Sequence, residues 1–432
     1  MRLVLTLLCS SLLGATGALA QPLKVDITEG ASAPLQISLA AASRVNEPGG
    51  GAPVASLPLL EVIQADLAST GLYNLVRHES AGAGELADEL KAARTRTSQG
   101  LVWFNAALSS ADTLRAECAY LDVYSGAVEA SAAFSVPAAQ ARRAAHKCAD
   151  LVFAHTSGEP GYFDTQFAVI TDSGTPLAPQ RRVTILDSDG FNPRYVSAPG
   201  MLTATPALSR DGKLSAYIGI ADGVTKLVVL DRTTGAERRI EAPGALLSMP
   251  AFAPDGRTLL VTMSREGNAD IVRYDLVSGN FTALTNAFGA DTAATFAPDG
   301  SKIVFQSDRS GQPQIYVMNP DGSDQRRLSF GDGSFANPAW SPRGDRIAFT
   351  FITDGAMQIG TMRADGSALR LLPAPWQDES PTWAASGTLL AFTRTTRTEA
   401  PQLWISDLTG KRQRRLPVPM AATEPSWSGL LP

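Results

Sequence analysis

The chain has 432 residues, 44% of them hydrophobic and 18% charged, so it is long enough for two domains of ordinary soluble composition. Its formal net charge of −5 argues against nucleic-acid binding, because neutralising phosphates requires a concentrated basic surface. Length, composition and charge therefore predict a soluble two-domain protein whose partners include no nucleic acid.

Residues 1–20 have the features of a secretory signal peptide. Arg2 supplies a positive start, residues 3–13 form an apolar run, and Ala18-Leu19-Ala20 is a typical cleavage motif. The apolar run is too short to cross a bilayer, and no later stretch reaches the roughly 18 apolar residues that a membrane helix needs. We therefore expect export to the periplasm, cleavage after Ala20 and no membrane insertion.

The next segment, residues 21–33, is typical of an extended arm. Apolar and polar side chains alternate along it, in Leu23, Lys24, Val25, Asp26 and Ile27. Such alternation suits the addition of a strand to the sheet of a partner. A strand of the chain's own domain fits the same pattern almost as well.

Residues 34–160 mix strand-like and helix-like patterns, which predicts a small α/β domain. We expect strands at 34–39, 101–105 and 119–123, and helices at 59–72 and 138–153. Asp66 lies off the apolar face of the first helix, and His146 lies in a basic run of the second. We interpret His146 as a solvated or partly buried structural residue. Residues 157–161 are the natural linker to the second domain.

Two cysteines remain after cleavage of the signal peptide, Cys118 and Cys148. An exported protein can join such a pair in a disulfide. Their separation in the sequence says nothing about geometry, so two buried free thiols fit equally well.

Residues 161–432 carry a repeat of about 44 residues. Segments such as Pro250-Ala-Phe-Ala-Pro-Asp-Gly256 begin at residues 206, 250, 294 and 338, then at 381, and the last, Pro425-Ser-Trp-Ser428, ends the series. Each unit has four short β-rich stretches separated by turns such as Asp-Gly, which favour the positive φ of tight turns. Four antiparallel strands per repeat, arranged radially, are typical of a β-propeller.

The two ends of the repeat region complement each other. Residues 166–197 contain the later strands of a unit but no first strand, whereas residues 425–428 are a first strand with nothing after it. Joined, they complete a sixth blade and remove the exposed edges of an open sheet. The sequence thus predicts an all-β six-bladed propeller plus a small N-terminal α/β domain, with an apolar or aromatic residue of each first strand packed between blades.

The chain shows no pattern typical of catalysis. It has no nucleophile elbow, phosphate loop or dinucleotide turn, and the histidines, His78, His146 and His155, all precede the ring. Asp-Gly pairs lack the alternating ligands of a calcium loop. We therefore predict no enzyme, no cofactor and no metal site.

Two stretches of the sequence carry a resemblance to a known family. Residues 314–331, QIYVMNPDGSDQRRLSFG, with residues 338–350, resemble the TolB family of periplasmic propeller proteins in the Tol-Pal system. Residues 142–150 and 157–165 resemble the junction between that family's two domains. The likeness in layout covers the mature chain, except that Cys148 replaces a commonly aliphatic residue and residues 34–39 match only loosely.

The resemblance implies a non-catalytic scaffold that maintains outer-membrane integrity and helps the outer membrane constrict at cell division. It implies binding of the lipoprotein Pal by one propeller face and of the inner-membrane protein TolA by the arm. Other Tol-Pal or outer-membrane proteins are further candidate partners.

The Pal-binding face can be placed by geometry. First strands line the channel of a propeller, so the residues just before them should form a polar, loop-borne rim at one mouth. These residues are Thr205, Ser248, Asp291, Thr292, Asn337, Asp378, Glu379 and Glu424. Each one alone is more typical of a solvated loop than of a binding hot spot.

Two other functions remain as alternatives. A propeller attached to a hydrolase would need a catalytic nucleophile, which the sequence lacks. A ligand-binding or sugar-processing propeller would need aromatic residues and carboxylates clustered at the channel mouth, which the predicted rim does not show.

Overall fold

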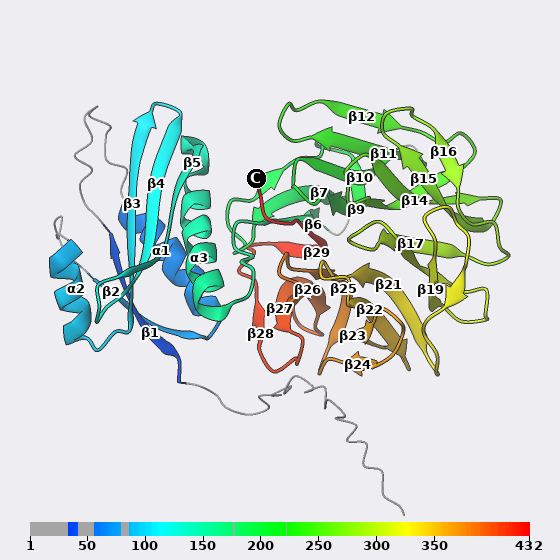
Figure 1. The fold of residues 1–432 in the computed structure, drawn as a ribbon. Coiled ribbons are helices and arrows are strands. Elements are labelled where there is room, and N and C mark those ends of the chain that lie inside the picture. Colours follow the sequence, from blue (N-terminus) through cyan, green and yellow to red (C-terminus); the bar gives the residue numbers. More distant parts are fainter. Residues whose placement is uncertain (1–32, 42–55, 79–85, 176–177, 222) are drawn as a thin grey trace, which may run out of the picture. The chain divides into compact units, whose positions relative to one another are not determined.

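The computed structural model describes residues 33–41, 56–78, 86–175, 178–221 and 223–432. The predicted signal peptide and the arm residues Leu23 to Ile27 lie outside the described residues. The described chain contains one five-stranded sheet with helices and six four-stranded sheets (Figure 1). No helix in the described ranges is both long enough and apolar enough to span a bilayer.

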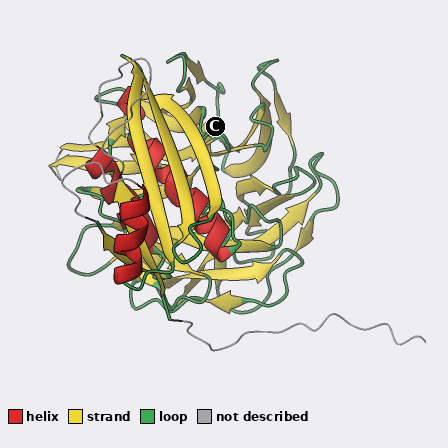
Figure 2. Ribbon diagram, turned by 60° about the vertical axis from the view of Figure 1, so that its left-hand side comes forward, coloured by secondary structure: helices red, strands yellow, loops and turns green. Residues whose placement is uncertain are grey.

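The five-stranded sheet has the order β2-β1-β3-β4-β5, and β1 is parallel to both of its neighbours. Alternation along β3 sends Val102 and Phe104 into the core with α1 and α3, and Leu101 toward Ala93 of α2 on the other face (Figure 2). The elements are β1 (Leu35–Ala41), α1 (Ser56–Ser69), β2 (Tyr73–Arg77), α2 (Leu86–Thr95), β3 (Gly100–Ser110), β4 (Thr113–Asp122), β5 (Val128–Pro137), η1 (Ala138–Gln140) and α3 (Arg142–Ser157).

The predicted mixture of helices and strands is confirmed in this region, with two corrections. The sequence did not predict β2, β5 or the polar helix α2. Asp66 and His146 are buried rather than solvated, because α1 and α3 pack together and the ring covers their shared edge. The structure also joins Cys118 of β4 to Cys148 of α3 in a disulfide.

The six four-stranded sheets are the blades of a propeller, each numbered outward from the channel. The first three blades are β9 (Leu202–Leu208), β10 (Leu214–Ala221), β11 (Val224–Asp231), β12 (Glu237–Ile240); β13 (Leu246–Phe252), β14 (Thr258–Arg265), β15 (Asn268–Asp275), β16 (Phe281–Ala283); and β17 (Asp291–Phe296), β18 (Ile303–Ser307), β19 (Gln314–Met318), β20 (Arg326–Arg327).

The other three blades include the one that closes the ring. They are β21 (Ser334–Trp340), β22 (Arg346–Thr353), β23 (Ala356–Arg363), β24 (Arg370–Leu371); β25 (Gln377–Trp383), β26 (Leu389–Thr395), β27 (Gln402–Asp407), β28 (Gln413–Arg415); and β29 (Ala421–Trp427), β6 (Gln166–Thr175), β7 (Ala178–Asp187), β8 (Arg194–Tyr195).

The predicted closure of the ring by the two ends of the repeat region is confirmed. The C-terminal strand β29 pairs antiparallel with β6, and Trp427 lies opposite Phe167. Apolar clusters fill the spaces between neighbouring blades; one contains Leu227 of β11 together with Leu259 and Tyr274 of the next blade. The aromatic residues of the inner strands pack between blades as predicted; Trp383, for example, packs against Ile359 of the preceding blade.

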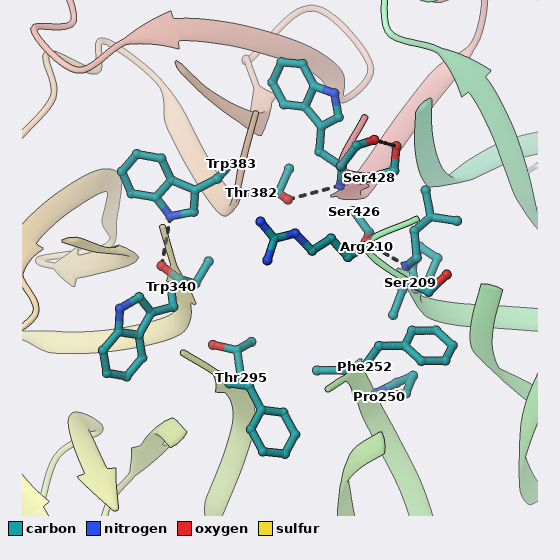
Figure 3. Close-up of a pocket in the computed structure, with 18 of the residues that line it drawn as sticks. Ser209, Arg210, Pro250, Phe252, Thr295, Trp340, Thr382, Trp383, Ser426 and Ser428 are labelled. Atoms are coloured by element: carbon teal, nitrogen blue, oxygen red, sulfur yellow. Dashed lines mark hydrogen bonds between the residues drawn. The ribbon is translucent and has the colours of Figure 1, made fainter. Parts of the chain in front are cut away.

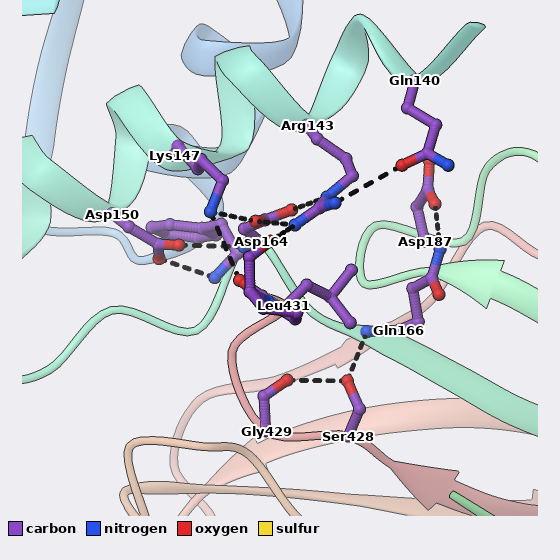
Figure 4. A network of polar contacts seen from close by, with 12 residues as sticks. Gln140, Arg143, Lys147, Asp150, Asp164, Gln166, Asp187, Ser428, Gly429 and Leu431 are labelled. Carbon is purple, nitrogen blue, oxygen red and sulfur yellow. Dashed lines mark hydrogen bonds and ion pairs between the residues drawn. The ribbon is translucent and has the colours of Figure 1, made fainter. Parts of the chain in front are cut away.

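Helix α3 is tied to the ring and to the end of the chain by the polar network in Figure 4. Arg143 binds both carboxylate oxygens of Asp164 at 2.9 Å and donates to the carbonyl oxygen of Pro432 at 2.8 Å. Lys147 donates to the carbonyl oxygen of Leu431, whose own N–H donates to Asp164 O. The carboxylate of Asp150 accepts from the N–H groups of Phe163 and Asp164. The junction is therefore held by side chains of α3.

Candidate functional site: the channel of the ring

The inner strands of all six blades surround a central channel, which forms a cavity of about 1240 Å³. Aromatic residues from successive inner strands line it, among them Phe252, Trp340 and Trp383 (Figure 3). The indole N–H of Trp383 donates to the carbonyl of Ala339 on the preceding blade at 2.9 Å, and that of Trp340 donates to Gly344 O. These hydrogen bonds fix the wall, so the channel is a preformed cavity.

Each inner strand contains a bulge at the same place. One residue per strand has φ between +47° and +56°, and the register of pairing shifts there: Thr205, Met249, Ala293, Asn337, Ser380 and Glu424. This backbone region is uncommon for residues other than glycine and costs on the order of 1 kcal/mol or more for each residue. A conformation that recurs in every blade must be compensated by the contacts around it.

The compensation comes from the neighbouring blade. At most of the bulges the backbone N–H donates to a side chain of the preceding blade, as Ser380 N does to Thr350 Oγ1 at 3.0 Å and Glu424 N to Thr393 Oγ1 at 3.1 Å. Where the ring closes, Thr205 N donates to Glu424 Oε2 at 2.6 Å. The bulges therefore link neighbouring blades around the channel.

The predicted rim residues lie within the inner strands or at the first residue of one, which corrects the expectation of loop positions. The inner strands begin about four residues earlier than the apolar repeat indicated, because the bulge precedes the regular spacing of the repeat. Of the predicted residues, the channel brings together Thr205, Asn337, Glu379 and Glu424. Ser248 and Thr292 are bulge neighbours that do not line it.

Two predicted rim residues are instead in ion pairs of the ring. Asp378 binds the guanidinium of Arg394 through both oxygens at 2.6 Å, with both side chains almost fully buried. Asp291 pairs with Arg309 at 2.6 Å and is completely buried. A buried carboxylate with such a partner is a structural element and is not available to a ligand.

The two glutamates in the channel differ in their environment. Glu424 lies 3.0 Å from Arg181 of β7 and accepts the N–H of Thr205, so it stabilises the closure of the ring. Within the described ranges, the carboxylate of Glu379 has no hydrogen-bond or ion-pair partner. Burial, reinforced by the charge of Glu424, raises the pKa of Glu379 above its usual range. Glu379 is therefore the carboxylate that a cationic group of a ligand would relieve.

Sequence reasoning missed two arginines of the channel. Arg181 lines the cavity from the second strand of its blade, a position that the pattern of first strands does not reveal. Arg210 extends into the channel in Figure 3. A signal for it was present, because Arg210 replaces the proline that Pro254, Pro298 and Pro342 place at this turn in other blades.

Exposed aromatic residues precede several inner strands. Phe288, Phe330 and Trp376 are 98%, 69% and 43% exposed and lie shortly before β17, β21 and β25. They belong to the end of the channel where inner strands begin. Such exposed apolar groups around a cavity are typical of a protein-binding surface.

The opposite end of the channel faces the helical part of the chain. Inner strands end there in loops that contact it, as in the ion pair of Arg343 with Glu159 and the hydrogen bond of Arg412 to Thr70 O. The end with the exposed aromatic residues is therefore the one remote from α3.

A buried serine, histidine and glutamate in the five-stranded sheet have the order of a catalytic relay. Ser38 Oγ lies 2.9 Å from His78 Nε2, and the other ring nitrogen of His78 contacts Glu89. Ser38 is completely buried in the central part of β1 and also contacts Ser98. A nucleophile without access to a substrate cannot react, so this network is structural.

Comparison with known proteins gives consistent matches. A family model described as the TolB beta propeller domain matches residues 153–431. Tol-Pal system protein TolB 1 of Novosphingobium aromaticivorans is 52% identical over 379 residues, which are 87% of this chain and 84% of that protein. Tol-Pal system protein TolB of Zymomonas mobilis is 47% identical over 422 residues, 95% of this chain and 91% of that one. Several other relatives of the same name match over about half of their own length.

A solved structure shares the fold over nearly the whole length. TolB from Acinetobacter baumannii superposes with a TM-score of 0.75 at 24% sequence identity, and the match covers 92% of this chain and 97% of that one. The α/β region and the ring thus occur together in a solved relative.

Proposed function

Because the chain belongs to the TolB family of the Tol-Pal system, we propose that it is a periplasmic binding scaffold of that system and not an enzyme. In this proposal the exposed end of the channel binds the lipoprotein Pal, and the arm, residues 21–33, binds TolA. By joining these partners the chain contributes to outer-membrane integrity and to constriction of the outer membrane during cell division.

The observation that carries the proposal is the composition of the exposed channel mouth. It combines the unpartnered carboxylate of Glu379 with the exposed side chains of Phe288, Phe330 and Trp376. A protein partner can bury the aromatic groups, which contribute roughly 25 cal/mol per Å² of apolar surface removed from water. A basic side chain of the partner would compensate Glu379 in a partly desolvated position, where charge pairs discriminate strongly between partners.

The lack of an accessible nucleophile supports a non-catalytic role. The serine–histidine–glutamate network around His78 is buried, and the carboxylates Asp291 and Asp378 of the ring are engaged by arginines. The remaining acidic pair of the channel, Glu379 and Glu424, has one member committed to closing the ring. The channel thus offers recognition chemistry without an evident acid–base pair.

The features of residues 1–33 support the second half of the proposal. The signal-peptide pattern is consistent with a periplasmic location, and the alternating arm can add a strand to a sheet of TolA. The arm precedes β1 directly, so it is attached to the α/β region and not to the ring. The two partners therefore use separate parts of the chain.

Affinity capture from envelope extract tests the function. The bait is the mature chain, and a second bait lacks residues 21–33. Both baits should recover Pal, identified by mass spectrometry, whereas TolA should be recovered only by the bait with the arm. Loss of Pal from both baits would refute the proposed role of the channel, and recovery of TolA by the shortened bait would refute that of the arm.

A further inference from the structure

Helices α1 and α3 meet the ring at a buried group of charges centred on His146. The Nδ1 atom of His146 lies 2.7 Å from Oδ2 of Asp66 on α1, and both side chains are only 2% exposed. One turn earlier on α3, Arg142 pairs with Asp189 and lies 3.6 Å from Asp187. These two aspartates belong to the end of β7 and the loop after it, so the group joins the helices to the ring.

The spacing of the group is tight. One side-chain atom from each of Asp66, His146 and Asp189 lies within 4.8 Å of the other two. Phe191, in the same loop as Asp189, carries the guanidinium of Arg142 4.9 Å above its ring. Arg142 is therefore held beside the carboxylate of Asp189.

The charges of the elements around His146 balance only when its imidazole is protonated. The α1 helix contributes Asp66, the ring loop contributes Asp187 and Asp189, and the positive groups are Arg142 of α3 and Arg414 of β28. Three carboxylates thus face two guanidinium groups, and an imidazolium supplies the third positive charge. Two further groups close to Asp66 are Asp150 of α3 and Tyr162 of the junction.

A buried carboxylate left without compensation is expensive, because removing one partner of a buried ion pair leaves an unpaired charge in a medium of low polarity. A divalent cation would fit the spacing but not the charges. It would have to displace the imidazole proton and compete with Arg142 for Asp189. The same charges are satisfied by a single proton on His146.

We propose that protonated His146 is a proton-dependent clasp that holds α1 and α3 against the ring, and that loss of this proton weakens the contact. The clasp is independent of partner binding at the channel. Its effect on the contact is reciprocal, because whatever separates the helices from the ring also weakens the hold of His146 on its proton.

The direction of the pH effect follows from the surroundings of the imidazole. Burial by itself lowers the pKa of His146, but the charge and hydrogen bond of Asp66, with the charges of Asp189 and Asp187, raise it to about 9 from 6.5. The stabilisation is complete below about pH 6.5 and is lost as the pH rises through about 9. A difference of this size corresponds to a change of roughly 300-fold in the equilibrium between native and unfolded chain.

Nuclear magnetic resonance of the imidazole groups tests the proposal directly, because the chain has only three histidines. The spectrum of His146 is assigned with His146→Gln, and His155→Gln is the matched control, since His155 pairs with Glu129 at the surface. The resonance of His146 should remain that of an imidazolium from pH 6 to pH 8. Asp66→Asn should lower its titration midpoint by at least one pH unit.

A second measurement does not depend on the Asp66 variant. Hydrogen exchange of α3 and of the loop after β7 should accelerate in the wild type between pH 7 and pH 10, after correction for the intrinsic pH dependence of exchange. In His146→Gln these segments should exchange faster already at pH 7 and show no further change. A midpoint of His146 at or below 6.5 would overturn the proposal. Saturable zinc binding at pH 7 that requires His146 would overturn it as well, because it would make a metal the bridging group.

Discussion

Replacing Trp427 by alanine should open the ring at its closure. Trp427 is the last residue of β29, where the C-terminus pairs with β6, and its indole lies 4.4 Å from the ring of Phe167. The indole N–H also donates to Thr165 Oγ1 at 2.8 Å. The side chain is only 8% exposed, so its removal leaves a cavity and an unpaired hydroxyl at the point where the two ends of the repeat region meet.

Removal of a buried tryptophan typically costs about 3–5 kcal/mol. With a urea dependence of about 3 kcal/mol per M, the unfolding midpoint should fall by roughly 1 M. The assay is urea unfolding followed by circular dichroism, with Trp376→Ala as the matched control because Trp376 is exposed. Equal midpoints for the two variants would refute the account of closure, since a buried and an exposed tryptophan would then contribute alike.

Three further predictions concern other buried groups. Asp378→Ala leaves Arg394 buried and unpaired, so it should cost about 3–5 kcal/mol in urea unfolding, and a loss below 1 kcal/mol would show that the pair is not needed. Reduction of the Cys118–Cys148 disulfide, which spans 30 residues, should lower stability by about 2–4 kcal/mol, and an unchanged midpoint with dithiothreitol would contradict this. Burial raises the pKa of Asp150 to about 7, so the native chain binds a proton that the unfolded chain releases above about pH 4. Stability from this group therefore falls as the pH rises from about 4 to 7, and Asp150→Asn should flatten that slope; an identical slope would count against it.

The ring was predictable because its information is periodic. A repeat of about 44 residues, a first strand at the C-terminus and the missing first strand near residue 166 together indicate six blades and their closure. Each feature recurs in several blades, so chance similarity in one blade does not mislead. The N-terminal region has no such redundancy, and the short polar helix α2 carries no strong apolar stripe.

The rim was only partly predictable, because the decisive features are contacts between positions far apart in the sequence. Asp378 and Glu379 are adjacent, yet one faces Arg394 in the blade and the other faces the channel. Neighbouring strand residues point to opposite faces, so assigning both to one rim could not hold. Burial of Asp66 likewise depends on α3 and the ring, which the pattern of its own helix does not show.

The structure also refines how the rim should be tested. Glu424 accepts the N–H of Thr205 and pairs with Arg181, so reversal of its charge would disturb closure of the ring along with any ligand contact. Glu379 has no such partner among the described residues, so its reversal isolates the effect on binding.

The most direct test of the central claim is calorimetric titration of the mature chain with purified, lipid-free Pal. We compare the wild type with Glu379→Lys, and with Glu117→Lys on the five-stranded sheet as a control of equal charge change. The account predicts that Pal binds the wild type and the control alike and binds Glu379→Lys at least tenfold more weakly, with an unchanged unfolding midpoint. Equal affinity for all three proteins would place the Pal site away from this carboxylate, and no binding to the wild type would contradict the proposed function itself.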